Sequence, residues 1–359
     1  MKADGGEEKK MKAEIIKIQG LPEDEKKIAR AGEILKKGGL VAFPTETVYG
    51  LGGNALDSQA SRKIYAAKGR PSDNPLIVHI AHVEDMKKIA AEVPESAKIL
   101  ARHFWPGPLT MILPRGAAVP LETTGGLESV AIRMPSHPVA RKLIEAGGGY
   151  IAAPSANTSG RPSPTTAAHV EEDLGESIDM IVDGGQVGIG IESTIVDLTE
   201  EIPTILRPGY ISLGDLQALL GEVRVDQGLL RTEEKVRPKA PGMKYRHYAP
   251  RAELTIVEGP MERVIDRING LVQEKKELGE TVGVICTEES RQAYPEGLVK
   301  CIGSRQQEET IAHHLYEVLR EFDSSDVSCI YSEAFDTPRM GQAIMNRLLK
   351  AAGHKVIQV

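Results

Sequence analysis

Cysteine is scarce in this sequence, and its three copies lie far apart. Cys286, Cys301 and Cys329 are odd in number, and no two of them have CxxC spacing. That pattern disfavours both a disulfide framework and a structural zinc site. All three lie in apolar runs, which predicts buried thiols.

Long hydrophobic runs and several well-known signatures are also missing. No stretch of about 18 apolar residues occurs, so we expect no membrane span. The polar N-terminus lacks the apolar core of a signal peptide, so we expect a cytoplasmic protein. The chain has no GxGxxG, GxxxxGK, HExxH or GxSxG motif, the usual markers of dinucleotide-binding, P-loop, zinc-protease and serine-hydrolase proteins.

Charge and aromatic content restrict a role in nucleic-acid binding. The formal net charge of −7 argues against a protein that coats nucleic acid, although a local basic groove remains compatible with it. Aromatic residues make up 4% of the chain, whereas RNA readers often stack bases on aromatic rings. The contents of 41% hydrophobic and 26% charged residues are those of an ordinary globular protein.

The residue pattern predicts a larger mixed α/β domain followed by a smaller one. Helical periodicity occurs at 24–37, 58–69 and 84–103, and short apolar strands such as GLVAF, LIVHIA and VAIRMP run into polar loops. Residues 235–252 contain six Lys or Arg and no acid, which is typical of a linker. The alternating strands and helices after it predict a parallel sheet. We therefore expect a flexible N-terminus at 1–13, a larger α/β domain at 14–212, a linker or lid at 213–251 and a second α/β domain at 252–359.

The segment FPTETVYG at 43–50 places hydroxyls, a carboxylate and an aromatic ring directly after the apolar run GLVAF. Connecting loops usually take Gly, Asn, Asp or Ser for turn geometry. Open α/β sheets bind ligands beyond the carboxyl ends of their strands, so this segment is a candidate binding wall. The alternative is a local network in which Thr45 or Thr47 caps the next turn.

Three arginines and a lysine are candidates for binding anions. Lys68 and Arg70 flank a glycine at a helix end, where they can clasp phosphates or simply favour the negative end of the helix dipole. Arg207 in LRPG is a second candidate for a phosphate or a nucleobase edge. Arg133 ends an apolar strand, and its planar fork suits a carboxylate, with a structural ion pair as the alternative.

Two further motifs carry weaker signals. His79 alternates with apolar residues in LIVHI, and a lone strand histidine is more often a hydrogen-bonded structural residue than a catalyst. In PSAN, the Ser155 hydroxyl and nearby backbone amides can hold a phosphate oxygen while Asn157 orients a neighbour. Serine loops also cap helices, so both possibilities stay open.

Taken in order, seven motifs resemble those of one family. FPTETVYGLG, KGRPSDNPLIVHI, WPGPLT, VAIRMP, AAPSANTSGRPSP, ESTI and LRPG are similar to the motifs of the threonylcarbamoyl-AMP synthases. The linker APGMKYRHYAP and the following segment resemble the long, two-domain form of that family. The resemblance covers about residues 14–355. It implies a YrdC-like twisted mixed sheet with helices, linked to a smaller Rossmann-like α/β domain.

The resemblance also implies an activity. The enzyme would be a nucleotidyltransferase that joins L-threonine, bicarbonate and ATP into threonylcarbamoyl-adenylate and releases pyrophosphate. ATP would be a substrate, Mg²⁺ would arrive on the nucleotide, and no metal site of the protein's own is expected. A downstream transferase complex would use the product to modify the adenosine beside the anticodon of tRNAs that read A-starting codons. A weak contact with tRNA is a further expectation.

Functional positions of the family fall on residues of this chain. Its KxR and SxN motifs correspond to the expected catalytic residues Lys68, Arg70, Ser155 and Asn157. The implied contacts of L-threonine are Thr45, His79, Arg133, Ala153 through its backbone, and Ser193. Those of ATP are Lys68, Ser72, Ser129, Ser155, Ser163, Arg207 and, from the linker, Tyr245. The family varies at Ser72 and Ser129, which favours backbone contacts there.

The linker and the function each keep alternatives. A tether with Tyr245, Arg246 and His247 can fold over a nucleotide and exclude water, or it can be a solvated connection. One rival function is an RNA-binding module that grips tRNA without chemistry. The other is carbamoyl transfer in hydrogenase maturation, but those proteins carry Cys-rich zinc elements that three scattered cysteines do not supply.

Overall fold

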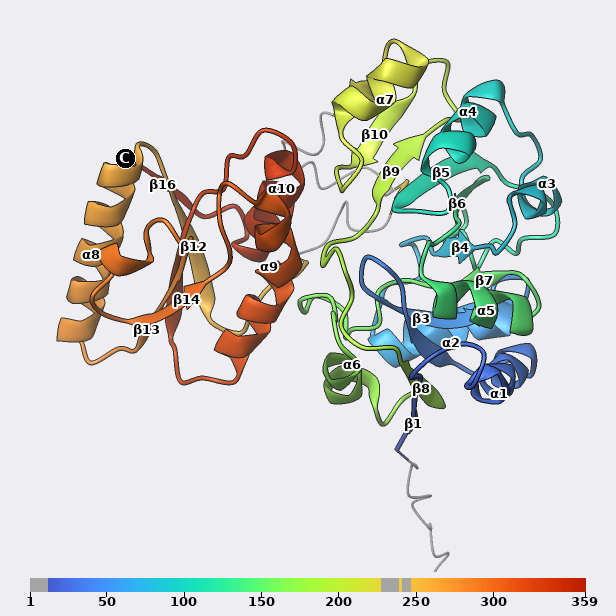
Figure 1. Ribbon diagram of the computed structural model, residues 1–359, viewed down its shortest axis with the longest axis horizontal. Helices are drawn as coiled ribbons and strands as arrows, with labels where there is room; N and C mark the ends of the chain where they lie inside the picture. The colour runs from blue at the N-terminus through green and yellow to red at the C-terminus, as the bar shows by residue number, and fades with distance from the viewer. Residues whose placement is uncertain (1–11, 227–238, 241–246) are drawn as a thin grey trace, which may run out of the picture.

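The computed structural model describes residues 12–226, 239–240 and 247–359 and folds them around two separate sheets (Figure 1). The sheet of eleven strands lies on the right of the figure, and the sheet of five strands lies on the left. Within these described residues no helix is long and apolar enough to cross a membrane. The predicted architecture, a mixed sheet followed by a smaller α/β unit, is confirmed.

The first sheet mixes parallel and antiparallel pairs in the order β1-β8-β2-β3-β7-β4-β6-β5-β9-β10-β11. Its strands are β1 (Glu14–Lys17), β2 (Val41–Pro44), β3 (Tyr49–Asn54), β4 (Ile77–His79), β5 (Leu109–Pro114), β6 (Ser129–Arg133), β7 (Ile151–Ala152), β8 (Met180–Asp183), β9 (Thr194–Asp197), β10 (Thr204–Arg207) and β11 (Arg224–Val225). The helices beside it are α1 (Glu25–Lys36), α2 (Ser58–Lys68), α3 (Met86–Ile89), α4 (Glu95–Phe104), α5 (Pro138–Ala146), α6 (Ala167–Leu174) and α7 (Leu213–Leu220), with a short 3₁₀ turn η1 (Val83–Asp85). Strand β11 therefore extends this sheet into the segment 213–251 that was expected to link the domains.

The segment after β2 is a tight hairpin rather than a long loop. Strand β3 returns antiparallel to β2, with Pro44 opposite Tyr49. Its sequence YGLGGN is rich in glycine, which usually weakens a strand. The glycines are needed for packing, because a Cβ added at Gly52 would lie 2.9 Å from both the Phe43 ring and the Ile151 side chain.

The prediction of a single helix at 84–103 is wrong. The chain forms η1 and α3, leaves the helix at Ala90 and starts α4 only after Pro94. A proline disfavours helical geometry in the residue before it, here Val93, so the apolar periodicity on either side could not join into one helix. Ala90 instead forms an isolated bridge with Arg115.

The second sheet is entirely parallel in its described pairs, as predicted. Its order is β14-β13-β15-β12-β16. The strands are β12 (Glu253–Glu258), β13 (Val282–Cys286), β14 (Leu298–Cys301), β15 (Cys329–Glu333) and β16 (Val356–Gln358), and the helices are α8 (Met261–Glu277), α9 (Glu308–Asp323) and α10 (Gly341–Ala351), with a 3₁₀ turn η3 (Arg291–Ala293). All three cysteines are free, and two are buried as expected, whereas Cys301 is partly exposed.

Helices α9 and α10 lie on the side of the second sheet that faces the first domain, and α8 lies on the far side (Figure 1). The contact is close. Gly190 of the first domain has a φ of +90°, and a Cβ there would lie 2.5 Å from the Cα of His313 on α9. His313 Nδ1 donates a hydrogen bond to Gly188 O at 3.0 Å. The second domain is therefore packed against the first, next to the loop that leads into β9.

Candidate active site

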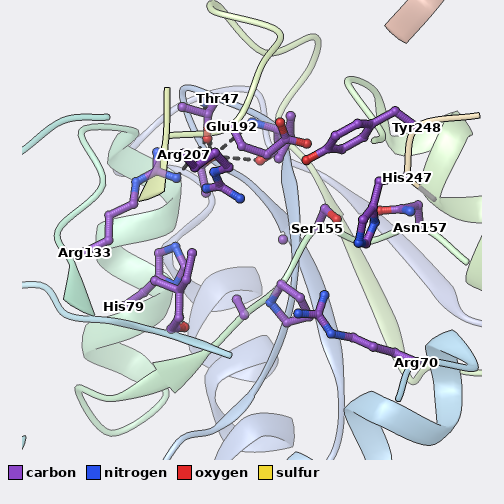
Figure 2. Close-up of a pocket in the computed structure, with 16 residues that line it drawn as sticks. Thr47, Arg70, His79, Arg133, Ser155, Asn157, Glu192, Arg207, His247 and Tyr248 are labelled. Carbon is purple, nitrogen blue, oxygen red and sulfur yellow. Dashed lines mark hydrogen bonds between the residues drawn. The ribbon is translucent and has the colours of Figure 1, made fainter. Parts of the chain in front are cut away.

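One cavity of the first domain gathers most of the polar residues singled out from the sequence (Figure 2). Strands β4 and β6 are parallel neighbours, and their last residues, His79 and Arg133, are paired in register. Such strand ends are the usual ligand-binding edge of an open sheet. The expected site residues that line the cavity are Thr45, Arg70, His79, Arg133, Ala153, Ser155, Asn157 and Arg207.

The hairpin turn between β2 and β3 forms one wall of this cavity. Thr45 Oγ1 donates to Val48 O at 2.7 Å and accepts bonds from the backbone nitrogens of Thr47 and Val48. The local network considered from the sequence is therefore present. Thr45, Thr47 and Val48 also line the cavity, so the same turn shapes both the fold and the candidate site.

Arg133 is 4% exposed and has donors to spare. Its Nη1 donates to Thr47 Oγ1 at 2.9 Å, and its Nη2 lies 2.8 Å from Glu46 Oε1 in an ion pair. Among the described residues, neither Arg133 Nε nor Nη2 has a partner in hydrogen-bonding geometry. A buried guanidinium that lines a cavity with unused donors suits an incoming carboxylate.

His79 lies beside Arg133 and is neutral at physiological pH. Burial lowers the pKa of His79 to about 3, and the neighbouring Arg133 adds to the effect. The ring donates from Nδ1 to Ile77 O at 3.1 Å, which leaves Nε2 as the acceptor nitrogen. The hydrogen-bonded structural histidine expected from the sequence is present, and it also lines the cavity.

Of the expected pair Lys68 and Arg70, Arg70 lines the cavity, whereas Lys68 does not line it and contacts the Ser155 loop. Burial lowers the pKa of Arg70 to about 10, so it stays charged at neutral pH. Lys68 is 2% exposed and donates to Ser155 O at 2.5 Å and to Asn157 O. Burial, with Arg70 nearby, holds the pKa of Lys68 well below its usual range. Through its two hydrogen bonds to backbone carbonyls, Lys68 holds the Ser155 loop in place.

Arg207 forms the opposite wall, and Ser193 is packed behind it. Arg207 donates from Nε to Ser193 O at 3.0 Å and from Nη2 to Ser193 Oγ at 3.1 Å. Ser193 Oγ also lies 2.7 Å from Thr110 Oγ1. The nearby Gly209 is indispensable for this packing, because a Cβ there would lie 2.4 Å from Thr194 N.

Glu192 is a cavity residue that the sequence did not single out. It accepts hydrogen bonds from Ser163 Oγ at 2.5 Å, from Tyr316 OH at 2.8 Å and from Arg347 Nε at 2.9 Å. Burial alone would raise the pKa of Glu192, but Arg347 and Arg207 outweigh it and hold the pKa at about 2. Glu192 is thus a permanent anion whose two oxygens are both engaged.

The end of the linker closes part of the cavity. His247 and Tyr248 line it, and the ring of Tyr248 lies 5.2 Å from that of Tyr316 on α9. Burial lowers the pKa of His247 to about 3. Its Nε2 has no hydrogen-bond partner among the described residues. The expected ATP contact Tyr245 and its neighbour Arg246 lie outside the described residues.

Comparisons with known proteins agree with this geometry. A family model described as "Telomere recombination" matches residues 33–209, and one described as "Threonylcarbamoyl-AMP synthase, C-terminal domain" matches residues 211–353. Threonylcarbamoyl-AMP synthase of Bacillus subtilis is 51% identical over 94% of this chain and 96% of its own length. That of Pyrococcus abyssi is 49% identical, covering 94% of this chain and 97% of its own length. This chain belongs to the threonylcarbamoyl-AMP synthase family.

Solved structures extend the match to three dimensions. A structure described as P. abyssi Sua5 complexed with L-threonine has a TM-score of 0.90 and 47% identity, covering 97% of this chain and 99% of that one. A double-alanine variant of P. abyssi Sua5 has a TM-score of 0.91 at the same identity, covering 97% and 98%. The fold of this synthase-family chain is therefore that of the long, two-domain form.

Some expected site residues of this synthase-family chain do not line the cavity. Ser163 and Ser193 are fully buried just behind it, in contact with Glu192 and Arg207 respectively. Ser72 is exposed in the loop after Arg70. Ser129 begins β6, whereas the cavity residue Arg133 ends it. The structure thus concentrates the site on eight of the expected residues.

Proposed function

We propose that this chain makes threonylcarbamoyl-adenylate and pyrophosphate from L-threonine, bicarbonate and ATP. The observation that carries the proposal is the arrangement of cationic groups around one buried cavity. Arg133, with unused donors, lies at the ends of β4 and β6, and Arg70 and Arg207 line the same space. One carboxylate and one triphosphate are the anions that such a set would hold.

The threonine subsite is assigned to the Arg133 side. Its carboxylate would bind Nε of Arg133 together with Nη2, which in the structure is ion-paired with Glu46 at 2.8 Å, and the neutral His79 ring and Thr45 would face its polar groups. Ala153 would contribute its backbone, and Ser193 would close the pocket from behind. The P. abyssi Sua5 structure with L-threonine supports a threonine site in this fold.

ATP is assigned to the Arg70 side. We place its phosphates against the Ser155 loop, where Arg70 would offset their charge, while Lys68 holds the backbone of the loop in place. Arg207 would contact the nucleotide from the opposite wall. The remaining proposed ATP contacts are Lys68, Ser72, Ser129, Ser155, Ser163 and, outside the described residues, Tyr245.

The reaction consists of two bond-forming steps. The neutral amine of threonine attacks the carbon of bicarbonate, and loss of water gives a carbamate. A carbamate oxygen then attacks the α-phosphorus of ATP, and pyrophosphate leaves with the electron pair of the broken P–O bond. Both steps need positioning and charge neutralisation more than a protein nucleophile. Glu192 is a poor candidate for a base, because its pKa is about 2 and both oxygens are engaged.

Mg²⁺ is assigned to the nucleotide. The carboxylate that lines the described part of the cavity, Glu192, is already bound by Ser163, Tyr316 and Arg347. It therefore offers no free oxygen to an ion, whereas the ATP phosphates do. When bound there, the ion would offset the charge that develops on the leaving pyrophosphate.

The linker is assigned the role of protecting the adenylate product until it is passed on. A reactive adenylate must be kept from water, and His247 and Tyr248 already line the cavity. The linker would act as a lid over the nucleotide. The adenylate would then pass, in the cytoplasm, to a transferase complex that modifies tRNA beside the anticodon, with at most a weak contact between this chain and tRNA.

The direct test is pyrophosphate release by the purified full-length chain with Mg²⁺, ATP, L-threonine and bicarbonate. We expect release to require both threonine and bicarbonate, so omission of either should reduce it to background. ATP turnover that is indifferent to threonine would overturn the substrate assignment. No turnover together with tight, salt-sensitive tRNA binding would favour an RNA-binding module instead.

A further inference from the structure

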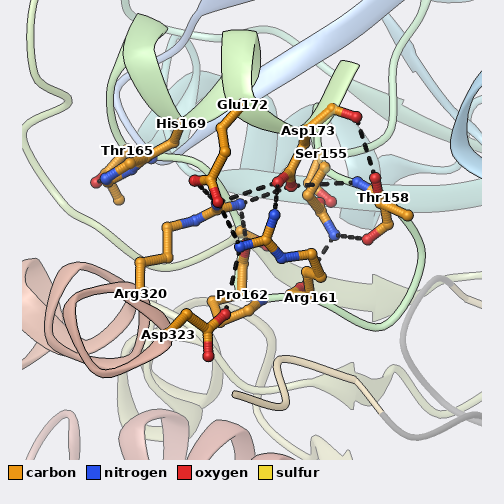
Figure 3. A network of polar contacts seen from close by, with 12 residues as sticks. Ser155, Thr158, Arg161, Pro162, Thr165, His169, Glu172, Asp173, Arg320 and Asp323 are labelled. Atoms are coloured by element: carbon orange, nitrogen blue, oxygen red, sulfur yellow. Dashed lines mark hydrogen bonds and ion pairs between the residues drawn. The ribbon is translucent and has the colours of Figure 1, made fainter. Parts of the chain in front are cut away.

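One face of α9 is directed at the loop that carries the proposed phosphate contacts (Figure 3). Tyr316, Arg320 and Asp323 are spaced so that they share a helical face. All three contact the first domain between residues 161 and 192. None of the functional residues predicted from the sequence lies in the second domain. Its contacts with the first domain therefore raise the question of what they contribute to the site.

Arg320 makes the most extensive of these contacts. It is 4% exposed, although it lies on a helix of the second domain. Its Nη2 donates to Pro162 O at 2.6 Å and to Asp173 Oδ2 at 2.8 Å, and its Nη1 lies 3.3 Å from Asp173 Oδ1. Glu172 lies 3.4 Å from Nη1. A bidentate, buried pair of this kind fixes orientation as well as position.

Asp173 passes this constraint to the loop. Its side chain is fully buried, and it accepts bonds from Thr158 N at 3.2 Å and from Arg161 Nη1. Arg161 in turn pairs with Asp323 of α9 at 3.3 Å. Asn157 Nδ2 donates to Thr158 O at 2.8 Å and to Arg161 O at 3.0 Å. An unbroken set of contacts therefore runs from Arg320 to Asn157 in the cavity wall.

The far end of the same loop is held from the second domain as well. Ser163 donates to Glu192, which is bound by Tyr316 of α9 and by Arg347 of α10. Arg347 is fully buried and also donates to Glu192 O at 3.0 Å. Both ends of the loop 157–163 thus depend on helices of the second domain.

We propose that Arg320 is a positioning residue for nucleotide binding, and that the second domain is in this way part of the catalytic unit. Arg320 does not line the cavity. It holds Pro162 and Asp173, and through them it sets the place of Asn157 and its loop. This inference rests on the proposed function, since it assigns the loop to ATP. The proposed threonine contacts on β4, β6 and the β2–β3 turn do not belong to this set of contacts between Arg320 and the loop.

The test replaces Arg320 by methionine in the full-length chain. We expect the KM for ATP to rise at least tenfold, while the Kd for L-threonine, measured calorimetrically without ATP, changes less than twofold. Arg267→Met is the matched control, because Arg267 lies on α8 and forms an exposed ion pair with Glu274 on the same helix. Arg320→Lys keeps the charge and should recover part of the ATP affinity.

A second measurement separates positioning from a general effect on stability. If Arg320 acts through Asn157, the double variant Arg320→Met/Asn157→Ala should bind ATP no more weakly than the worse single variant. Additive losses, equal losses for ATP and threonine, or an unchanged KM for ATP would each overturn the proposal. Should Arg320→Met not fold, Asp323→Asn takes its place with the same expectations. Lack of turnover in the wild-type chain would instead overturn the proposed function.

Discussion

The Arg133→Met variant is expected to raise the KM for L-threonine about 100-fold, which corresponds to about 2.7 kcal/mol of lost binding. Removing one partner of a buried, charged hydrogen-bond pair costs about 2–5 kcal/mol. Arg133 is the guanidinium with unused donors at the ends of β4 and β6, so the substrate carboxylate would lose its main partner. Steady-state kinetics with threonine varied at saturating ATP and bicarbonate would measure the change.

Two controls separate this effect from a loss of folding. Arg115→Met removes another partly buried arginine, paired with Glu128 at 2.8 Å beside the opposite end of β6, and should leave the KM for threonine unchanged. Arg133→Lys keeps the charge but loses the fork, so it should fall between the wild type and Arg133→Met. If Arg133→Met is folded and keeps the wild-type KM, the assignment of the carboxylate to Arg133 is wrong.

Lys68→Met is expected to lower kcat by about 100-fold, the size of effect that misplacement of a binding loop can have. Lys68 donates to the carbonyls of Ser155 and Asn157, so its removal would release the loop from this support. Two buried carbonyls would also lose their partner, and we expect the free energy of unfolding to fall by about 1–3 kcal/mol. Single-turnover kinetics and urea unfolding would measure the two effects.

Lys63→Met is the matched control for Lys68. Lys63 lies on the same helix and also donates to a backbone carbonyl, that of Gly38 at 2.6 Å, away from the cavity. The control should lose some stability while keeping its kcat. Wild-type turnover in a folded Lys68→Met variant would contradict the role assigned to Lys68.

The cavity could be predicted from the sequence where local pattern and strand register coincide. The apolar runs LIVHI and SVAIR end in His79 and Arg133, and parallel pairing brings these two ends together. The end of α2 at Gly69 could also be predicted, because helices commonly end at a glycine in the left-handed conformation. Gly69 adopts this conformation, with a φ of +59°. Which side of the Ser155 loop Lys68 would occupy could not be predicted, because that depends on tertiary packing.

The contribution of the second domain could not be predicted from local pattern at all. Tyr316, Arg320 and Arg347 lie on helices whose periodicity is that of any amphipathic helix. Their structural role depends on partners far away in the chain, such as Glu192 for Arg347. The same limit explains β3, whose glycines suggest a loop until Phe43 and Ile151 are seen to leave no room for larger side chains.

The most direct test of the central claim is to identify the product made from ¹³C-bicarbonate. The wild-type chain would be incubated with the labelled bicarbonate, ATP, Mg²⁺ and L-threonine, and the nucleotide products would be analysed by mass spectrometry. The account predicts an adenylate that contains threonine and one labelled carbonyl carbon. An unlabelled threonyl-adenylate, or AMP alone under conditions that preserve the adenylate, would contradict it.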